Sequence, residues 1–255
     1  MSAGTYAPKP GAAPMSRMIT AQAAFETKML LRNGEQLLLT VVIPSLLLVL
    51  FSTVDITDTG SGKAVDFLAP GILALAVMST AFTGQAISTG FERRYGVLKR
   101  LGTSPLPRWA LMTAKTLSVL AVEVLQIALL TAIAFGLGWS PQGNPLSVLL
   151  LLILGTAAFS GLGLLMAGTL KAEATLAAAN LVFLLLLVGG GVIVPLDKFP
   201  DAAQSVLGLL PISALSDGLR DVLQHGAGIP WGNLGILAVW SVLGLGAAAR
   251  FFRWE

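Results

Sequence analysis

Long apolar stretches separated by short polar segments dominate the pattern of the chain. Six of these stretches carry at most one charged residue each. A helix of about 20 apolar residues crosses the roughly 30 Å hydrocarbon core of a bilayer. The pattern therefore predicts an all-α polytopic membrane protein with six transmembrane helices. The predicted spans cover about residues 37–54, 67–91, 116–139, 146–170, 174–196 and 229–249.

The segment before the first span divides into two parts. Residues 1–14 are rich in Ala, Pro and Gly, so they bury too little apolar surface to fold and are expected to form a disordered tail. Residues 15–35 instead have helical periodicity, with Met18, Phe25 and Met29 on one face. We therefore expect an amphipathic interfacial helix along the membrane surface.

A further apolar run, residues 202–216, has 15 residues and contains Pro211. It is too short to span a bilayer, so we expect the external segment 197–228 to contain a re-entrant hairpin between the fifth and sixth spans. The pattern leaves little room for a separate soluble domain. Residues 15–255 are therefore interpreted as a single transmembrane domain.

Two features inside the spans predict specific packing. Pro44 in the first span frees a backbone carbonyl, which a neighbouring helix is expected to satisfy. Gly161 and Gly163 in the fourth span permit close approach of another helix or local bending.

Composition narrows the class of protein. Hydrophobic residues make up 55% of the 255 residues and charged residues only 11%. A soluble domain carries about 25% charge, which argues against a soluble enzyme. The chain has no cysteine and a single histidine, His225. It lacks the ligands for a disulfide framework, a thiolate site or a multi-histidine centre, and we predict no metal site.

The basic residues near the span ends predict the orientation. Thirteen of the 16 lie on the side of the N-terminal segment, the loop between the second and third spans, and the C-terminus. The other side holds only Lys63, Lys198 and Arg220, together with all seven aspartates. Because cytoplasmic loops carry the excess of Lys and Arg, both termini and residues 92–108 are predicted to be cytoplasmic.

The cytoplasmic loop 92–108 has the most informative pattern. An acidic residue and two arginines are followed by a glycine, by Leu-Lys-Arg-Leu and by Ser-Pro-Leu-Pro-Arg. A short helix here would present Val97, Leu98 and Leu101 as a small apolar face, and the prolines would end it. On charge alone, the better interpretation is a loop that sets the topology and contacts anionic lipid.

This order of residues resembles the signature of ABC type-2 export permeases, the family that includes daunorubicin-resistance-like drug efflux permeases. The family's usual form is close to Glu-Arg-Glu-x-Gly-Thr-Leu-x-Arg-Leu. Here Arg94 stands in place of the second acid and Val97 in place of the threonine. The resemblance also covers the amphipathic helix, six spans with both ends inside, and the proline-punctuated external hairpin.

The resemblance implies that this loop fits a groove in an ATPase subunit and passes the closure of that subunit to the spans. Residues 15–35 would brace the same contact from the membrane surface. The residues that the resemblance assigns to ATPase coupling are Glu92, Arg93, Arg94, Gly96, Leu98, Lys99, Arg100 and Leu101.

The resemblance also implies partners. The chain itself has no phosphate-binding loop, because its only Gly-Lys pair, Gly62-Lys63, lacks glycine at position 57 and Ser or Thr at position 64. ATP and Mg²⁺ would be used by two separate ABC ATPase subunits, and we expect no cofactor in this chain. The second permease would be another copy in a homodimer or a homologue in a heterodimer, in the lipid of a bacterial plasma membrane. Nucleic acid is not an expected partner, because the basic loop lacks interleaved aromatic residues.

Four polar side chains at membrane depth form a candidate substrate path: Glu123, Gln126, Gln85 and Asn180. Glu123 is a proton carrier, an anchor for a cationic substrate, or a carboxyl hydrogen-bonded to a neighbouring helix. Gln126 lies three residues further on roughly the same face, so the two are a candidate polar patch. Polar side chains at membrane depth, such as those of Gln85 and Asn180, more often form hydrogen bonds between helices than bind ligands.

We therefore interpret the chain as the permease subunit of an ATP-driven exporter of a hydrophobic or amphipathic substrate, such as a drug, a lipid or a lipid-linked glycan. The alternative is a proton- or ion-coupled secondary transporter that uses Glu123. Such carriers often contain internal repeats, and residues 37–139 and 146–249 show no convincing repeat. An intramembrane enzyme has no catalytic residues in its favour.

Overall fold

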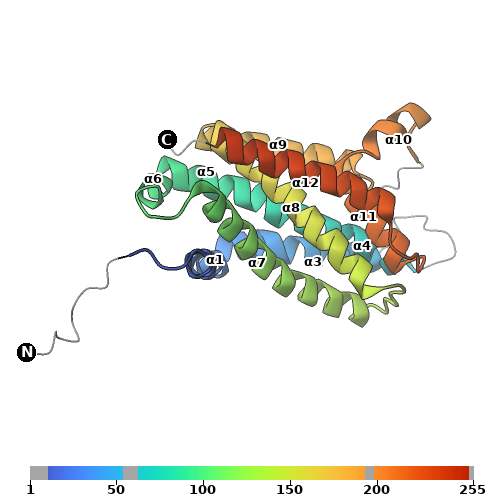
Figure 1. Cartoon of the computed structure of the whole chain (residues 1–255). Helices are drawn as coiled ribbons and strands as arrows, with labels where there is room; N and C mark the ends of the chain where they lie inside the picture. The colour runs from blue at the N-terminus through green and yellow to red at the C-terminus, as the bar shows by residue number, and fades with distance from the viewer. Residues whose placement is uncertain (1–10, 54–62, 193–197, 253–255) are drawn as a thin grey trace, which may run out of the picture.

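The computed structural model describes residues 11–53, 63–192 and 198–252, and this part of the chain contains helices and no strand. The long helices run side by side in one bundle (Figure 1). One end of the bundle carries α1 (Met15–Arg32) and α6 (Val97–Leu101), and we call it the α6 end. The predicted all-helical fold is confirmed for these residues. Most of the predicted disordered tail, residues 1–10, lies outside them.

Within the described residues, five helical stretches are long and apolar enough to cross a membrane. The first is continuous through α4 (Ala64–Val77), the π-helical segment η2 (Met78–Gly84) and α5 (Gln85–Arg94). The other four are α7 (Arg108–Gly136), α8 (Pro145–Thr169), α9 (Ala172–Gly189) and α12 (Trp231–Phe251).

The first predicted span has a different form. It is helical through α2 (Gly34–Leu37), the π-helical segment η1 (Leu38–Val42) and α3 (Ile43–Thr53). Its apolar part, Thr40–Thr53, is shorter than the five long stretches, and residues 54–62 lie outside the described part of the chain. The described residues therefore contain five candidate membrane spans of full length rather than six.

The helices do not end where the apolar runs end. α5 continues to Arg94 and α7 begins at Arg108, so the helices take in charged residues on both sides of the predicted loop 92–108. Backbone hydrogen bonds hold these terminal turns regardless of side-chain polarity. α9 ends at Gly189, before the predicted end at residue 196, and residues 193–197 are not described.

The centre of the bundle is α4. All of its residues from 68 to 77 are buried, because α3, α7, α8 and the short helix α11 (Pro211–Leu223) pack around it. α4 carries no charge after Asp66, and an uncharged apolar helix is the kind that an interior position requires.

The segment after α9 forms two short helices separated at residues 208–210. α10 (Asp201–Leu207) has no buried residue, whereas α11 is buried along most of its length against α4, α8 and α12. Pro211 is the first residue of α11, a position that tolerates the missing N–H. Both helices lie at the end of the bundle opposite α6 (Figure 1).

α1 lies across the α6 end of the bundle. Figure 1 shows it nearly end-on, whereas the long helices run across the view. α1 packs against α7 through the side that contains Ala23, while Phe25 and Met29 remain 60% and 59% exposed. Met18 is half-buried. The predicted apolar face is therefore largely turned away from the bundle.

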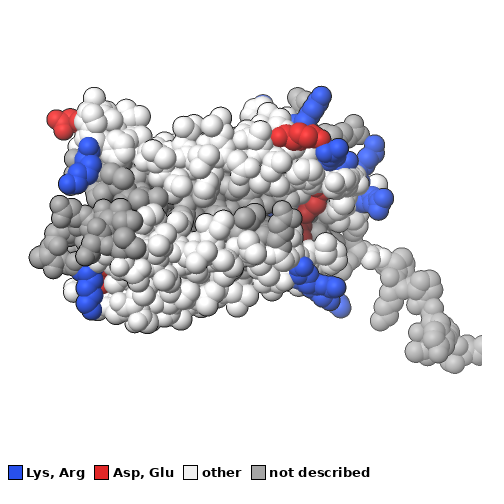
Figure 2. Space-filling view, turned by 180° about the vertical axis from the view of Figure 1, so that it is seen from behind, with Lys and Arg blue, Asp and Glu red and all other residues white. Residues whose placement is uncertain are grey.

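Charged side chains gather at the two ends of the molecule and leave a broad uncharged band between them (Figure 2). Lys and Arg are concentrated at the α6 end, in α1, α5, α6 and the first turns of α7. This distribution is typical of a helix bundle that crosses a membrane with one basic side.

α8 and α12 approach closely at a pair of glycines. A β-carbon at Gly161 would lie 2.5 Å from the backbone nitrogen of Leu245 and 2.6 Å from the carbonyl carbon of Gly244. A β-carbon at Gly163, on the same helix, would lie 2.8 Å from the carbonyl oxygen of Phe82 in η2. The two glycines predicted to permit close approach therefore contact two different helices.

We expect Gly161→Ala to lower the thermal stability of the purified protein, because the added methyl group forces α8 and α12 apart. Overpacking of this kind costs about 1–3 kcal/mol. Gly246→Ala is the matched control, because a β-carbon at Gly246 would meet nothing within 4 Å. The measurement is the melting temperature of each variant in detergent. Equal melting temperatures for the two variants would contradict the close crossing.

Candidate functional site

The turn between α5 and α6 is the site that the sequence singled out. Gly96 has a φ of 72°, a left-handed conformation that residues with a β-carbon adopt only with strain. It ends α5 and lets the chain turn into α6, which lies at the extreme end of the bundle (Figure 1). The left-handed backbone conformation at this turn therefore explains why the motif has glycine at position 96.

α6 is anchored to the bundle mainly by Leu98, with Leu101 packed against the same apolar cluster. Leu98 is fully buried and Leu101 is half-buried, whereas Val97, Lys99 and Arg100 are exposed. Of the predicted apolar face, Val97 therefore does not pack inward. Leu98 belongs to a small apolar cluster with residues of α7, α8 and α12. Its buried members are Leu98, Leu106, Ala110, Leu111, Met112, Leu164, Ala248 and Phe252.

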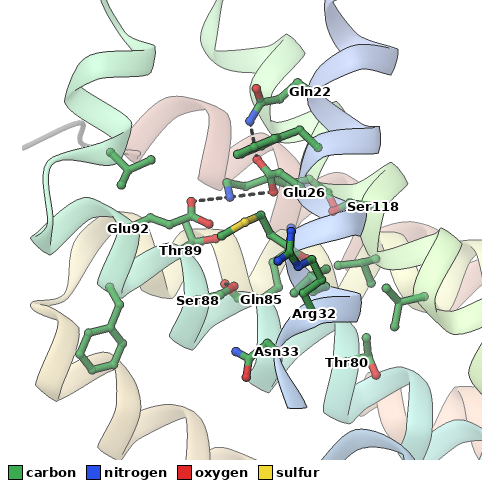
Figure 3. A pocket seen from close by; sticks show the side chains of 18 of the residues that line it. Gln22, Glu26, Arg32, Asn33, Thr80, Gln85, Ser88, Thr89, Glu92 and Ser118 are labelled. Carbon is green, nitrogen blue, oxygen red and sulfur yellow. Dashed lines mark hydrogen bonds and ion pairs between the residues drawn. The ribbon is translucent and has the colours of Figure 1, made fainter. Parts of the chain in front are cut away.

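A buried ion cluster joins α5 to α1 and α7. Lys115 of α7 is 2% exposed, and its Nζ lies 2.6 Å from Glu92 Oε2 and 2.9 Å from Glu26 Oε2. Gln22 Nε2 donates to the second oxygen of Glu26 at 2.9 Å. Figure 3 shows Gln22 and Glu26 on one side of this cluster and Glu92 on the other.

The cluster fixes three elements relative to one another. An ammonium inside a protein is strongly destabilising unless carboxylates and hydrogen bonds surround it. Lys115 obtains one carboxylate from α1 and one from α5. A movement of α5 at Glu92 would therefore have to carry α1 and α7 with it or separate buried charges.

The two arginines after Glu92 extend these links to other helices. Arg93 Nη2 donates to the carbonyl of Leu170 at the end of α8, and Arg94 forms an ion pair with Glu173 at the start of α9. Arg94 stands where the family form has an acid, and in this chain an acid on α9 faces it. Both partners of the second pair are more than half exposed, so it contributes about 0–1 kcal/mol.

Gln126 bridges the two π-helical segments inside the bundle. Pro44 has no N–H and cannot donate to the carbonyl of Thr40, four residues earlier. Gln126 Nε2 donates to that carbonyl in η1, and Thr80 Oγ1 in η2 donates to Gln126 Oε1 at 2.9 Å. The prediction that a neighbouring helix satisfies the freed carbonyl is confirmed.

Glu123 contacts a different helix. It is 2% exposed, and its Oε2 accepts a hydrogen bond from Thr156 of α8. Its Oε1 is buried without a hydrogen-bond partner among the described residues. Since Gln126 bonds to η1 and η2, the two side chains do not share hydrogen-bond partners. The two members of the candidate polar patch therefore bond to different helices.

Gln85 and Asn180 occupy contrasting places. Gln85 is 4% exposed, and within the described part of the chain neither its Nε2 nor its Oε1 has a hydrogen-bond partner. Asn180 is exposed on α9. Gln85 lines a cavity that also reaches Thr80, the partner of Gln126. The structure thus brings Gln85 near the Gln126 bridge and leaves Asn180 on the outside of the bundle.

A second buried cation lies at the opposite end. Arg220 of α11 donates to the carbonyl of Gly191 at 2.6 Å and to that of Val192 at 2.7 Å, just after α9. Its guanidinium carbon lies 4.0 Å from the ring centroid of Phe67 in α4 and its Nη1 lies 3.2 Å from Asp217. Burial raises the pKa of Asp217, although Arg220 beside it opposes the shift. Arg220 therefore ties α11 to α4 and to the end of α9.

Sequence analysis missed the partners of both buried cations. A signal for Lys115 was available, because the lysine falls seven residues inside a helix that becomes apolar, and such residues have acidic partners. The identity of the partners was not readable, since Glu26 and Glu92 are 89 and 23 residues away along the chain.

Comparison with known proteins places the chain among membrane transport proteins. Residues 51–250 match a family described as ABC-2 family transporter protein. YvfS of Bacillus subtilis (strain 168), whose name describes it as a transport permease, is 26% identical over 230 residues, which cover 89% of this chain and 93% of YvfS.

Two further relatives are longer than this chain. The linearmycin resistance permease protein LnrN of Bacillus subtilis (strain 168) is 29% identical over 205 residues, or 78% of this chain and 51% of LnrN. ABC transporter G family member 20 of Dictyostelium discoideum is 27% identical over 173 residues, or 66% of this chain and 23% of that protein. The chain thus spans about half of LnrN and a quarter of the Dictyostelium protein.

We expect Lys115→Ala to destabilise the protein by about 3–5 kcal/mol, because it leaves two carboxylates without their cation in a buried site. Arg94→Ala, which removes a cation from an exposed pair at the same end, should change stability by at most about 1 kcal/mol. Thermal unfolding in detergent compares the two variants. Adding Glu26→Gln and Glu92→Gln to Lys115→Ala should restore part of the loss, and no restoration would contradict the electrostatic cause.

Proposed function

The chain belongs to the ABC-2 family of transporter proteins, and from this premise we propose that it is the membrane-spanning subunit of an ATP-driven exporter. Permeases of ABC transporters act with ATPase subunits. In this proposal two separate ATPases bind ATP and Mg²⁺ in the cytoplasm and dock on the α6 end. The permease works as a homodimer or with a homologous permease.

The docking proposal rests on the contrast between the buried side of α6 and its exposed basic side. Its inner side is anchored through Leu98, whereas Lys99 and Arg100 project outward from the end of the bundle. A short rigid helix with exposed basic side chains suits an acidic groove on a partner, because opposite charges steer association and fix the register.

The buried ion cluster offers a route by which a movement of α6 could reach the membrane-spanning helices. Displacement of α6 by a closing ATPase would reach α5 through the turn at Gly96 and then α1 and α7 through Glu92, Lys115 and Glu26. α1 would thereby brace the docking helix, and Met18, Phe25 and Met29 would face the membrane surface or a partner.

The distribution of charge and the placement of the helix ends support the orientation. α1 begins and α12 ends at the α6 end (Figure 1), and this end holds most of the Lys and Arg. We propose that both termini are cytoplasmic, that residues 37–54 complete a sixth span, and that α10 and α11 form the external re-entrant segment. The host membrane is proposed to be a bacterial plasma membrane.

α9 offers a surface for the second permease. Its buried residues are confined to Ala172, Thr175 and Ala179, so most of its apolar side chains face outward. We place the substrate path between two permeases along this surface, with Asn180 in it. A hydrophobic or amphipathic substrate, such as a drug, a lipid or a lipid-linked glycan, suits such apolar walls, and the name of LnrN associates that relative with linearmycin resistance.

We expect the double variant Lys99→Glu with Arg100→Glu to lose co-purification with the ATPase encoded nearest its gene. Both side chains are exposed, so the permease should remain folded. Lys198→Glu, an exposed basic residue at the opposite end, is the control. The measurement is ATPase bound per tagged permease, together with ATP hydrolysis of the complex. Unchanged docking and hydrolysis in the double variant would show that α6 is not the docking helix.

The unpaired oxygen of Glu123 is the observation that favours a second candidate, a proton- or ion-coupled carrier. Glu123→Gln keeps an acceptor for Thr156 and removes only the ability to ionise. If the exporter proposal is right, efflux of fluorescent amphipathic dyes from proteoliposomes will need ATP and will change by less than about twofold in Glu123→Gln. Efflux without nucleotide that collapses in this variant would instead establish the carrier.

A further inference from the structure

A cavity of about 910 Å³ opens inside a single copy of the chain, between α1, the start of the first span, α5 and α7. Its size is that of a ligand site for a drug-sized molecule. It lies at the α6 end of the bundle and extends from the level of α1 to Thr40 and Thr80. Its wall includes the buried ion cluster, but most of its lining residues have no part in the proposed docking of the ATPase.

The mouth of the cavity is apolar and exposed. Phe25 and Met29 of α1 line it while remaining about 60% exposed, and Tyr95 and Val97 line it from the turn before α6 and from its first residue. Exposed aromatic and aliphatic side chains at the level of an interfacial helix suit contact with the inner half of a bilayer. A ligand could therefore enter sideways from lipid.

The interior of the cavity contains polar groups without partners. Gln85 and Thr89, one helical turn apart on α5, are 4% and 0% exposed and line the cavity. The amide of Gln85 and the hydroxyl of Thr89 have no hydrogen-bond partner in the described part of the chain. Figure 3 shows both on the α5 wall, facing Glu26 and Arg32 of α1.

Unpaired buried polar groups are costly unless a ligand completes their hydrogen bonds. Amide and hydroxyl groups both donate and accept, so they complement hydroxyl or amide groups rather than a bare charge. The ionised side chains described in the wall also balance, since Glu26 and Glu92 are matched by Arg32 and Lys115. The cavity therefore favours a ligand without net charge.

We propose that this cavity binds an uncharged amphipath, with its hydroxyl- or amide-bearing head on Gln85 and Thr89 and its apolar part toward Phe25 and Met29. The inference deepens the proposed function and rests on it only for the fate of the ligand, which would be cargo taken up from the inner leaflet. Binding itself requires neither nucleotide nor an ATPase.

The test uses the full chain alone in phosphatidylcholine nanodiscs. The probe is octyl glucoside with a photoreactive diazirine in its alkyl chain, and labelled residues are identified by mass spectrometry. We expect labelling of α1, α5 and α7 around the cavity, competed by unlabelled octyl glucoside. Octyl phosphate and octyltrimethylammonium with the same photoreactive chain should label these positions several times less.

Two variants remove the proposed contacts. Gln85→Leu should reduce labelling of the cavity about tenfold and Thr89→Val about threefold, as expected for the loss of two and of one hydrogen bond. Gln142→Leu, at the opposite end of the molecule, is the control and should label as the wild type does. Since the side-chain amide of Gln85 makes no hydrogen bond in the described structure, Gln85→Leu should melt no lower than the wild type.

Labelling of the cavity residues that is unchanged in both variants, or that unlabelled octyl glucoside does not compete, would overturn the site. Equal or stronger labelling by a charged analogue would overturn the class of ligand. The proposed function fails separately, because the variant Lys99→Glu with Arg100→Glu should lose ATPase docking and keep the photolabelling.

Discussion

A lysine ammonium enclosed in an apolar helix bundle is the constraint on which the α6 end of the protein depends. Lys115 is stable there only because α1 and α5 each supply a carboxylate. This requirement holds α1 crosswise at the end of the bundle even though Phe25 and Met29 stay exposed. It also fixes the position of α5 at Glu92, immediately before the turn into α6.

A related rule operates at two places where the backbone becomes irregular inside the bundle. Pro44 frees the carbonyl of Thr40 and Gln126 satisfies it, and the chain after α9 leaves carbonyls that Arg220 satisfies. Several buried side-chain atoms lack a hydrogen-bond partner among the described residues, and the amide of Gln85 is informative among them because it lines open space. It borders a cavity large enough to hold the molecule that would complete its hydrogen bonds.

The proposed docking helix and the proposed ligand cavity share one wall in this arrangement. Glu26, Glu92 and Lys115 form the link from α6 to the spans and also line the cavity below α1. A shift of α6 would therefore change the shape of the cavity, and a ligand in the cavity would oppose some shifts. This geometry gives a physical route by which an ATPase in the cytoplasm and a molecule from the membrane could sense each other.

The sequence by itself determined the class of protein, the approximate positions of the five long spans, the helical form of residues 15–32 and the need for glycine at the turn before α6. These follow from local rules, because hydropathy over about 20 residues and the backbone freedom of glycine need no knowledge of distant contacts. The boundaries were less accurate, since α5 and α7 extend through charged residues that hydropathy counts as loop.

Only the tertiary structure decided which side chains meet. It gave Gln126 and Glu123 different hydrogen-bond partners, left Asn180 outside the bundle, and gave Lys115 its partners from segments 89 and 23 residues away. The physical reason is that burial of a charge specifies that a partner must exist, but the packing of helices in three dimensions decides which residue lies within reach.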